Sequence, residues 1–95
     1  MSEEFEWDFS KAQANEEKHG VTFTTATRAF LDTFGLDLVD DRHGDDEDRF
    51  TLIAFVDARL LVVSYTVRGE RMRIISARLA EPLERRMYHE AFDDW

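Results

Sequence analysis

Two apolar segments close together in the second half of the chain constrain its fold most. Phe50–Val56 and Leu60–Val67 are apolar at consecutive positions and rich in β-branched and aromatic side chains, which is typical of central strands covered on both faces. Only Asp57-Ala58-Arg59 separates them, and a connection this short permits only an antiparallel hairpin. We therefore expect an antiparallel sheet at the centre of the fold.

A third strand continues this sheet. Arg68-Gly69-Glu70 has the composition of a tight turn, and residues 71–78 return as the third strand of a meander. Strict alternation along that strand predicts two faces. One face would carry Arg71, Arg73, Ile75 and Ala77, and the other would carry Met72, Ile74, Ser76 and Arg78.

The N-terminal half carries helix signals. Residues 5–7 alternate as a short strand would, and Ser10 and Gln13 form a capping box that opens a helix over residues 10–19, ended by Gly20. Thr22 or Thr24 is expected to cap a second helix that ends near residues 32–33.

The remaining elements complete the expected order. Residues 36–40 form a weak strand before a highly charged loop, and Pro82 suits the first turn of a last helix. Leu83, Met87 and Ala91 line one face of that helix. The order is β-α-α-β-β-β-β-α, an α+β fold in which two N-terminal helices and one C-terminal helix pack on the antiparallel sheet.

Length and composition indicate one domain. Ninety-five residues, 43% of them hydrophobic, suffice for one core but not for two, so we expect a single domain over residues 1–95. No cysteine is present, which excludes disulfides and cysteine-ligated zinc. The acidic start of the chain and the absence of an apolar run of about 20 residues argue against export and membrane insertion. We expect a cytoplasmic protein.

The charge is distributed unevenly. The net charge is −9, which by itself argues against nonspecific binding to nucleic acid. Residues 1–57 hold five basic and fifteen acidic side chains, giving −10, whereas residues 59–86 hold seven arginines and three acids, giving +4. Positive potential is therefore concentrated in the expected meander.

Ordered motifs over residues 5–88 resemble the BrnT family of bacterial toxins. In the first half they are Phe5-Glu6-Trp7-Asp8, Lys11, Asn15, Lys18-His19-Gly20-Val21, Phe23, Phe30, Asp40, His43, Glu47, Arg49 and Phe50. In the second half they are Leu61-Val62-Val63, Tyr65-Thr66, Arg68-Gly69, Arg73-Ile74-Ile75-Ser76-Ala77-Arg78, Glu84-Arg85-Arg86 and Tyr88.

This resemblance implies a RelE-like ribonuclease fold and a toxin of a type II toxin–antitoxin system that cleaves RNA and arrests translation and growth. It also implies a ribbon-helix-helix antitoxin of the BrnA kind, paired toxin and antitoxin chains in a hetero-oligomer, and contact with operator DNA through the antitoxin. The chain departs from the family after Arg78, where Leu79, Glu81 and Leu83 replace further basic residues. An alternative function is therefore a catalytically weak binding module that acts as an antitoxin-bound co-repressor of its operon.

RNA cleavage through the ribose 2′-oxygen needs a base, an acid and cations around the phosphorane-like transition state. Arginine suits the cationic role because its planar fork binds phosphate oxygens bidentately. Candidates are Arg68, Arg71, Arg73 and Arg78. Since some of them could instead pair with carboxylates, we expect about two of the four to contact RNA.

Histidines are the candidates for proton transfer. His19, which the resemblance covers, titrates near neutrality, but an imidazolium at a helix C-terminus could equally serve as a cap. Lys18 could contact phosphate or cap the same helix end. His43 and Glu47 lie in the charged loop, which is either a catalytic loop or a solubilising one.

The other candidates have structural interpretations as well. Arg49 follows Glu47 by two positions, so an ion pair between them comes first and RNA contact second. Tyr65 could stack on a base or donate a proton, but we expect a core role because it lies inside an apolar strand. Three isolated histidines, and no Gly-rich phosphate loop, predict neither a metal site nor a cofactor.

Overall fold

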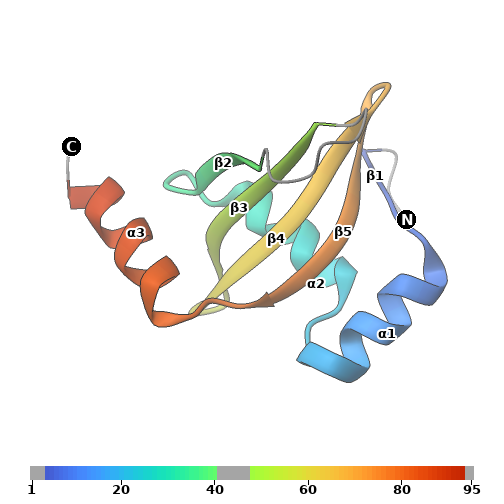
Figure 1. The fold of residues 1–95 in the computed structure, drawn as a ribbon, viewed down its shortest axis with the longest axis horizontal. Coiled ribbons are helices and arrows are strands. Elements are labelled where there is room, and N and C mark those ends of the chain that lie inside the picture. Colours follow the sequence, from blue (N-terminus) through green and yellow to red (C-terminus); the bar gives the residue numbers. More distant parts are fainter. Residues whose placement is uncertain (1–3, 41–47, 94–95) are drawn as a thin grey trace.

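The computed structural model describes residues 4–40 and 48–93. Figure 1 shows a twisted sheet with the first helices on one side of it and the last helix standing at one end. The elements are β1 (Phe5–Glu6), α1 (Phe9–His19), α2 (Phe23–Thr27), the 3-10 helix η1 (Arg28–Leu31), β2 (Leu36–Asp40), β3 (Arg49–Val56), β4 (Arg59–Arg68), β5 (Arg71–Leu79) and α3 (Pro82–Asp93). The expected α+β fold and its element order are confirmed, while the RelE-like classification stays a prediction.

The sheet is mixed. Its strand order is β1-β5-β4-β3-β2; β2 to β5 pair antiparallel, as expected, but β1 runs parallel to β5, with Phe5 opposite Met72 and Glu6 opposite Arg73. Parallel strands need a long crossover connection, and here two helices and three strands lie between β1 and β5.

Two turns fix the meander. Asp57 and Ala58 both have positive φ, at 51° and 66°, the left-handed pair whose twist matches the strands of a two-residue hairpin. Arg28 holds Asp57 through two hydrogen bonds of 2.8 and 2.7 Å. At the second turn Gly69 has a φ of 60°, a value that glycine adopts without steric cost.

The helix α1 begins earlier than predicted. The Lys11 amide donates to the Asp8 carboxylate at 3.1 Å, so Asp8 is the N-cap and Ser10 lies inside the first turn. The predicted capping box at Ser10 is therefore wrong, because Asp8 is an equally good cap two residues upstream. Gly20 ends the helix with a φ of 70°, and Thr22 caps α2, both as expected.

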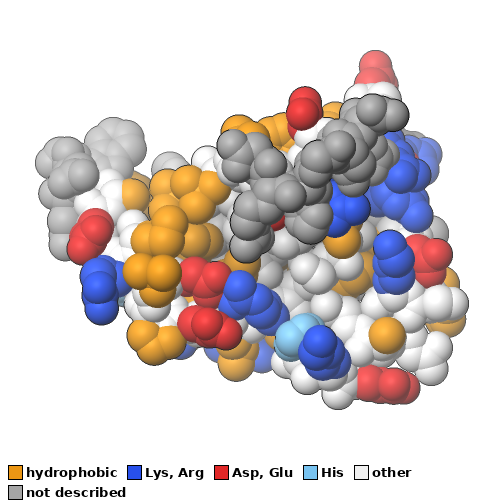
Figure 2. Space-filling view, viewed as in Figure 1, with side chains coloured by type: hydrophobic (Ala, Val, Ile, Leu, Met, Phe, Trp, Pro, Cys, Tyr) orange, Lys and Arg blue, Asp and Glu red, His pale blue; other side chains and the backbone are white. Residues whose placement is uncertain are grey.

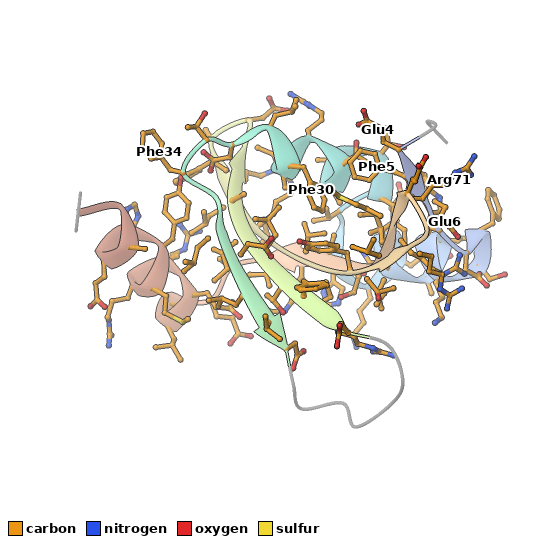
Figure 3. All side chains as sticks on the ribbon, turned by 90° about the horizontal axis from the view of Figure 1, so that it is seen from above. Glu4, Phe5, Glu6, Phe30, Phe34 and Arg71 are labelled. Atoms are coloured by element: carbon orange, nitrogen blue, oxygen red, sulfur yellow. The ribbon has the colours of Figure 1, made fainter. Side chains whose placement is uncertain are left out.

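Helices α1, α2 and η1 cover one face of the sheet. The core on this face contains Val21, Phe23, Ala26, Leu61 and Val63, all at most 2% exposed. The rings of Phe5 and Phe30, labelled in Figure 3, pack 5.2 Å apart and join β1 to η1.

The helix α3 covers part of the opposite face. Its buried side chain is Tyr88, which packs with Ile53, Leu60 and Val62 and whose ring lies 5.2 Å from that of Phe55. The predicted apolar face of α3 does not form a buried stripe, because Leu83 is 64% exposed. The described helices include none long and apolar enough to span a membrane.

Asn15 joins α1 to the sheet. Its side-chain amide donates to the carbonyl oxygens of Ala77, at 2.7 Å, and Val21, at 3.0 Å, and its Oδ1 accepts from the Ala77 amide at 3.1 Å. The residue is 8% exposed, so each of these backbone groups would be left without a partner by a shorter side chain.

We expect Asn15→Ala to lower the free energy of unfolding by about 3 kcal/mol, because it leaves three buried backbone groups unsatisfied. Urea denaturation followed by circular dichroism measures the loss. Gln13→Ala, which truncates an exposed amide on the same helix, is the control and should change stability by less than about 0.5 kcal/mol. Equal effects of the two substitutions would contradict this role of Asn15.

Candidate functional site

Away from α3, the sheet face opposite α1 and α2 is polar. We call this surface the open face. Its side chains are Glu6, Arg49, Thr51, Ser64, Thr66, Arg68, Arg71, Arg73, Ser76 and Arg78. Figure 2 looks onto this face and shows Lys and Arg side chains gathered where β4 and β5 meet. A polar sheet face that includes five arginines is a plausible surface for a phosphate-bearing ligand.

A β-bulge in β5 determines which arginines share the open face. Ser64 pairs with Ser76 while the next residue, Tyr65, pairs with Ile74, so Ile75 is the extra residue. Beyond the bulge the alternation is shifted by one. The predicted grouping of Arg71 with Ala77, and of Arg78 with Met72, is therefore wrong: Ala77 is buried in the helix-side core, and Arg78 lies on the open face with Arg73.

Pairing between strands arranges the open face in rows. One row runs through Arg49, Thr66, Arg73 and Glu6. The next holds three hydroxyls, Thr51, Ser64 and Ser76, each opposite its neighbour. In the third row Arg78 stands beside Val62 and Ile53, at the margin of the core under α3.

The row with Arg73 contains an ion pair. Nη1 of Arg73 lies 2.7 Å from a carboxylate oxygen of Glu6, and the two side chains are 26% and 25% exposed. Both groups are thus held in place yet accessible from solvent. Arg68 and Arg71 face each other at the adjoining turn, and Figure 3 shows Glu6 and Arg71 at the same corner of the sheet.

The third row contains a second ion pair. Arg78 donates to both carboxylate oxygens of Glu84, at 2.8 and 2.6 Å, and so ties β5 to the first turn of α3. The hydrogen bond from Arg78 outweighs partial burial and lowers the pKa of Glu84, with help from the Glu81 amide. A carboxylate here already occupies the bidentate geometry that a phosphate would use.

The two ion pairs are too far apart to bind one phosphate. Their arginines stand opposite Thr66 and Val62, four β4 positions apart, which is about 13 Å at 3.3 Å per residue. A chain of several nucleotides could contact both. The predicted arginines therefore share one face but divide into a cluster of Arg49, Arg68, Arg71 and Arg73 and a separate Arg78.

Lys18 and His19 lie at the Arg78 end. The strand β1 pairs with β5 at Arg73, and the helix α1 that follows it runs along β5 toward its C-terminal end. Asn15 of this helix contacts Ala77. His19, one turn further and on the same side of the helix, is thus carried beyond Ala77. Lys18 is exposed and His19 half-buried. The structure does not bring His19 to Arg73.

His43 and Glu47 lie outside the described residues. The residues on either side of that segment belong to the Arg73 row: Asp40 pairs with Arg49 on the neighbouring strand, and the carbonyl oxygen of Asp48 accepts from the Thr66 hydroxyl at 2.5 Å. The expected pairing of Arg49 with Glu47 stays a prediction.

Glu6 is the polar residue that sequence reasoning missed. The alternation of residues 5–7 assigned it only to the polar side of a short strand. The signal that could have identified its role is that this strand needs a neighbouring strand, whose side chains would then face Glu6. Only the parallel pairing with β5 places its carboxylate against Arg73. The hydroxyl row was missed for the same reason, since it depends on pairing across three strands.

Tyr65 has the expected core role. It is 5% exposed, faces α1 and α2, and donates a hydrogen bond of 2.7 Å to Asp37. Burial and this hydrogen bond raise its pKa well above the ordinary value, so the hydroxyl stays protonated and fixed. Among the described residues no three His, Asp or Glu side chains are grouped as metal ligands would be.

Comparison with known families gives one match. Residues 7–84 match the model of the BrnT_toxin family, described as the ribonuclease toxin, BrnT, of a type II toxin–antitoxin system. The matched region includes α1, all of β2 to β5 and the first residues of α3. A search of curated proteins finds no match.

The ion pair between Arg78 and Glu84 predicts a pH effect. Because the folded state lowers the pKa of Glu84 below 4.5, its stabilisation is complete above that pH and is lost as the pH falls through the folded value. Glu84→Gln should therefore reduce the difference in urea midpoint between neutral and acidic pH. Glu90→Gln, at an exposed carboxylate on the same helix, is the control. An unchanged difference in Glu84→Gln would contradict the assignment.

Proposed function

The chain belongs to the BrnT family of ribonuclease toxins of type II toxin–antitoxin systems, and from this premise we propose that it is an endoribonuclease that binds RNA on its open face. In this proposal cleavage of RNA in the cytoplasm arrests translation and growth. The observation that carries the proposal is the bulge at Ile75, which brings the arginines of both ends of β5 to one polar surface.

The Arg73 row is the proposed cleavage site. Arg73, Arg71, Arg68 and Arg49 surround the scissile phosphate and stabilise the charge that grows on its oxygens. Support comes from the accessible pair of Arg73 and Glu6 at 2.7 Å, which sets a base beside a phosphate-binding fork. Reaction without a metal ion follows, because the guanidinium groups supply the positive charge.

The proposed reaction is an internal transfer. The 2′-oxygen forms a bond to phosphorus while its proton passes to the Glu6 carboxylate, and the bond from phosphorus to the 5′-oxygen breaks. An acid returns a proton to that oxygen, leaving a 2′,3′-cyclic phosphate and a 5′-hydroxyl. His43 and Glu47 are the candidates for this second transfer, because their segment lies between two residues of the Arg73 row, Asp40 and Asp48.

The Arg78 end is the proposed second contact for the RNA strand. Arg78, Lys18 and His19 would hold a phosphate beyond the scissile one, with the hydroxyls of Thr51, Ser64 and Ser76 between the two. His19 is in this proposal a phosphate contact rather than the acid at Arg73. The separation of about 13 Å derived from the strand rise is what favours this division.

Regulation by an antitoxin is part of the proposal. Type II toxins act with an antitoxin, and we propose a ribbon-helix-helix partner of the BrnA kind, paired with this chain in a hetero-oligomer that contacts operator DNA through the antitoxin. Binding would neutralise the toxin by covering the open face.

A second candidate function follows from the ion pairs. Arg73 and Arg78 both already hold carboxylates, and the chain carries a net charge of −9, so RNA must displace Glu6 or Glu84 to gain bidentate contact. A toxin fold that binds the antitoxin and acts as co-repressor without cleaving RNA would have these properties.

Cleavage of RNA by the purified chain separates the two candidates. We expect Arg73→Ala to lower the rate about 10²- to 10³-fold, because one charged donor to the transition state is lost. Arg85→Ala, at an exposed arginine of α3 away from the open face, is the control and should retain the parent rate. The assay is run in EDTA with labelled RNA, and the ends of the products are identified.

Three results would decide against the proposal. An inactive parent chain would favour the co-repressor function, and activity that is lost in EDTA would exclude a metal-independent mechanism. Equal rates for parent and Arg73→Ala would remove the cleavage site from the open face. Glu6→Gln, compared with Glu4→Gln at an exposed neighbour, tests the base: only the former should slow cleavage.

A further inference from the structure

A groove lies between the edge of the sheet and α3. Its volume is about 290 Å³, and its walls are β2, β3 and the first half of α3. The lining residues are Leu38, Val39, Asp40, Thr51, Ile53, Leu83, Glu84 and Met87. Most of them are apolar, and the groove leads directly onto the open face, to which Thr51 belongs.

An apolar side chain on the groove is left in water. Leu83 is 64% exposed, and Leu38, Ile53 and Met87 line the groove beside it. In Figure 2 hydrophobic side chains gather over α3 and the neighbouring end of the sheet. Apolar side chains that cluster around a groove, rather than being scattered singly, indicate a surface that binds another chain.

The wall formed by β2 is also an edge of the sheet. The strand order ends at β2, so no described strand pairs with its outer side. At the other edge of the sheet, backbone groups of β5 have partners: β1 pairs with β5, and Asn15 supplies both a donor and an acceptor to Ala77. An edge strand beside an apolar groove is the geometry used to add a strand from a partner.

The charges favour a cationic occupant over a second copy of this chain. The charged residues that line the groove are Asp40 and Glu84, and β2 itself contains Asp37 and Asp40 but no basic residue. Two copies paired through β2 would bring aspartates of both copies together with no basic residue between them, which is destabilising. A segment with Lys or Arg beside its apolar side chains would be attracted instead.

We propose that an extended, cationic segment of the antitoxin adds to β2 as a further strand and inserts apolar side chains into this groove. This inference rests on the proposed complex of toxin and antitoxin, and it names the toxin surface that the antitoxin binds. Because the groove includes Glu84, the partner of Arg78, a segment seated there lies against the Arg78 end of the open face. The segment would then cover the second phosphate contact of the proposed RNA surface.

Hydrogen–deuterium exchange of the toxin, free and in complex with the antitoxin encoded beside its gene, tests strand addition. Backbone amides of residues 36–40 should exchange more slowly in the complex. Unchanged exchange in β2, protection confined to the α1 and α2 side, or failure of the two chains to form a complex would each overturn the proposal.

Paired substitutions test the groove. Met87→Ser and Leu83→Ser, at two apolar residues that line the groove, should each weaken binding of the antitoxin about tenfold by calorimetry, the loss expected for truncation of a buried apolar contact. Leu31→Ser, at an apolar residue that is 81% exposed on the opposite face, should leave the affinity unchanged. Affinity should also fall as salt is raised. Equal effects of all three substitutions, or an affinity that does not depend on salt, would contradict a cationic segment in this groove.

These measurements concern binding and need no RNA. A chain that cleaves no RNA but shows protection of β2 would therefore lose the proposed enzyme activity and keep this interface. A chain that cleaves RNA but binds antitoxin elsewhere would keep the activity and lose the interface.

Discussion

The contact between Asn15 and Ala77 is the interaction on which the rest of the fold depends. Through it a side chain supplies β5 with the donor and acceptor that a neighbouring strand would otherwise provide. The sheet can therefore end at β5 with only the two residues of β1 beyond it. The same contact holds α1 along that edge, so that α1 and α2 cover one face and leave the opposite face without a helix near Arg73.

The bulge at Ile75 determines what the uncovered face contains. In a regular strand Arg73 and Arg78, which are five positions apart, would point to opposite sides of the sheet. The extra residue lets Ala77 enter the helix-side core beside Asn15 while Arg78 faces outward. The same bulge thus buries Ala77 against α1 and exposes Arg78. Bulges commonly lie near functional sites.

Local signals in the sequence were sufficient to predict the helices and strands, but not to predict which side chains meet on the open face. Apolar runs, turn residues and Pro82 predicted the element order, and the meander strands within about one residue, because these depend on neighbours in sequence. The bulge gives no such signal, since Ile75 lies among residues of similar propensity. Glu6 contacts Arg73, a residue 67 positions away in the sequence. Tyr88 rather than Leu83 anchors α3, because Asp32 and Phe55 lie beneath Tyr88. Non-local pairing decides all three.

Two carboxylates hold α3 in a position that serves both surfaces. Asp32 accepts from the Tyr88 hydroxyl at 2.8 Å; burial alone would raise the pKa of Asp32, but the amides of Phe55 and Phe34 and this hydroxyl outweigh it and lower that pKa. Glu84, on the same side of the helix, is held by Arg78. Because Tyr88 and Glu84 are one helical turn apart, a shift of α3 that opens or closes the groove at Leu83 must also alter the hold on Arg78. The groove and the Arg78 end of the open face are therefore mechanically coupled through one helix.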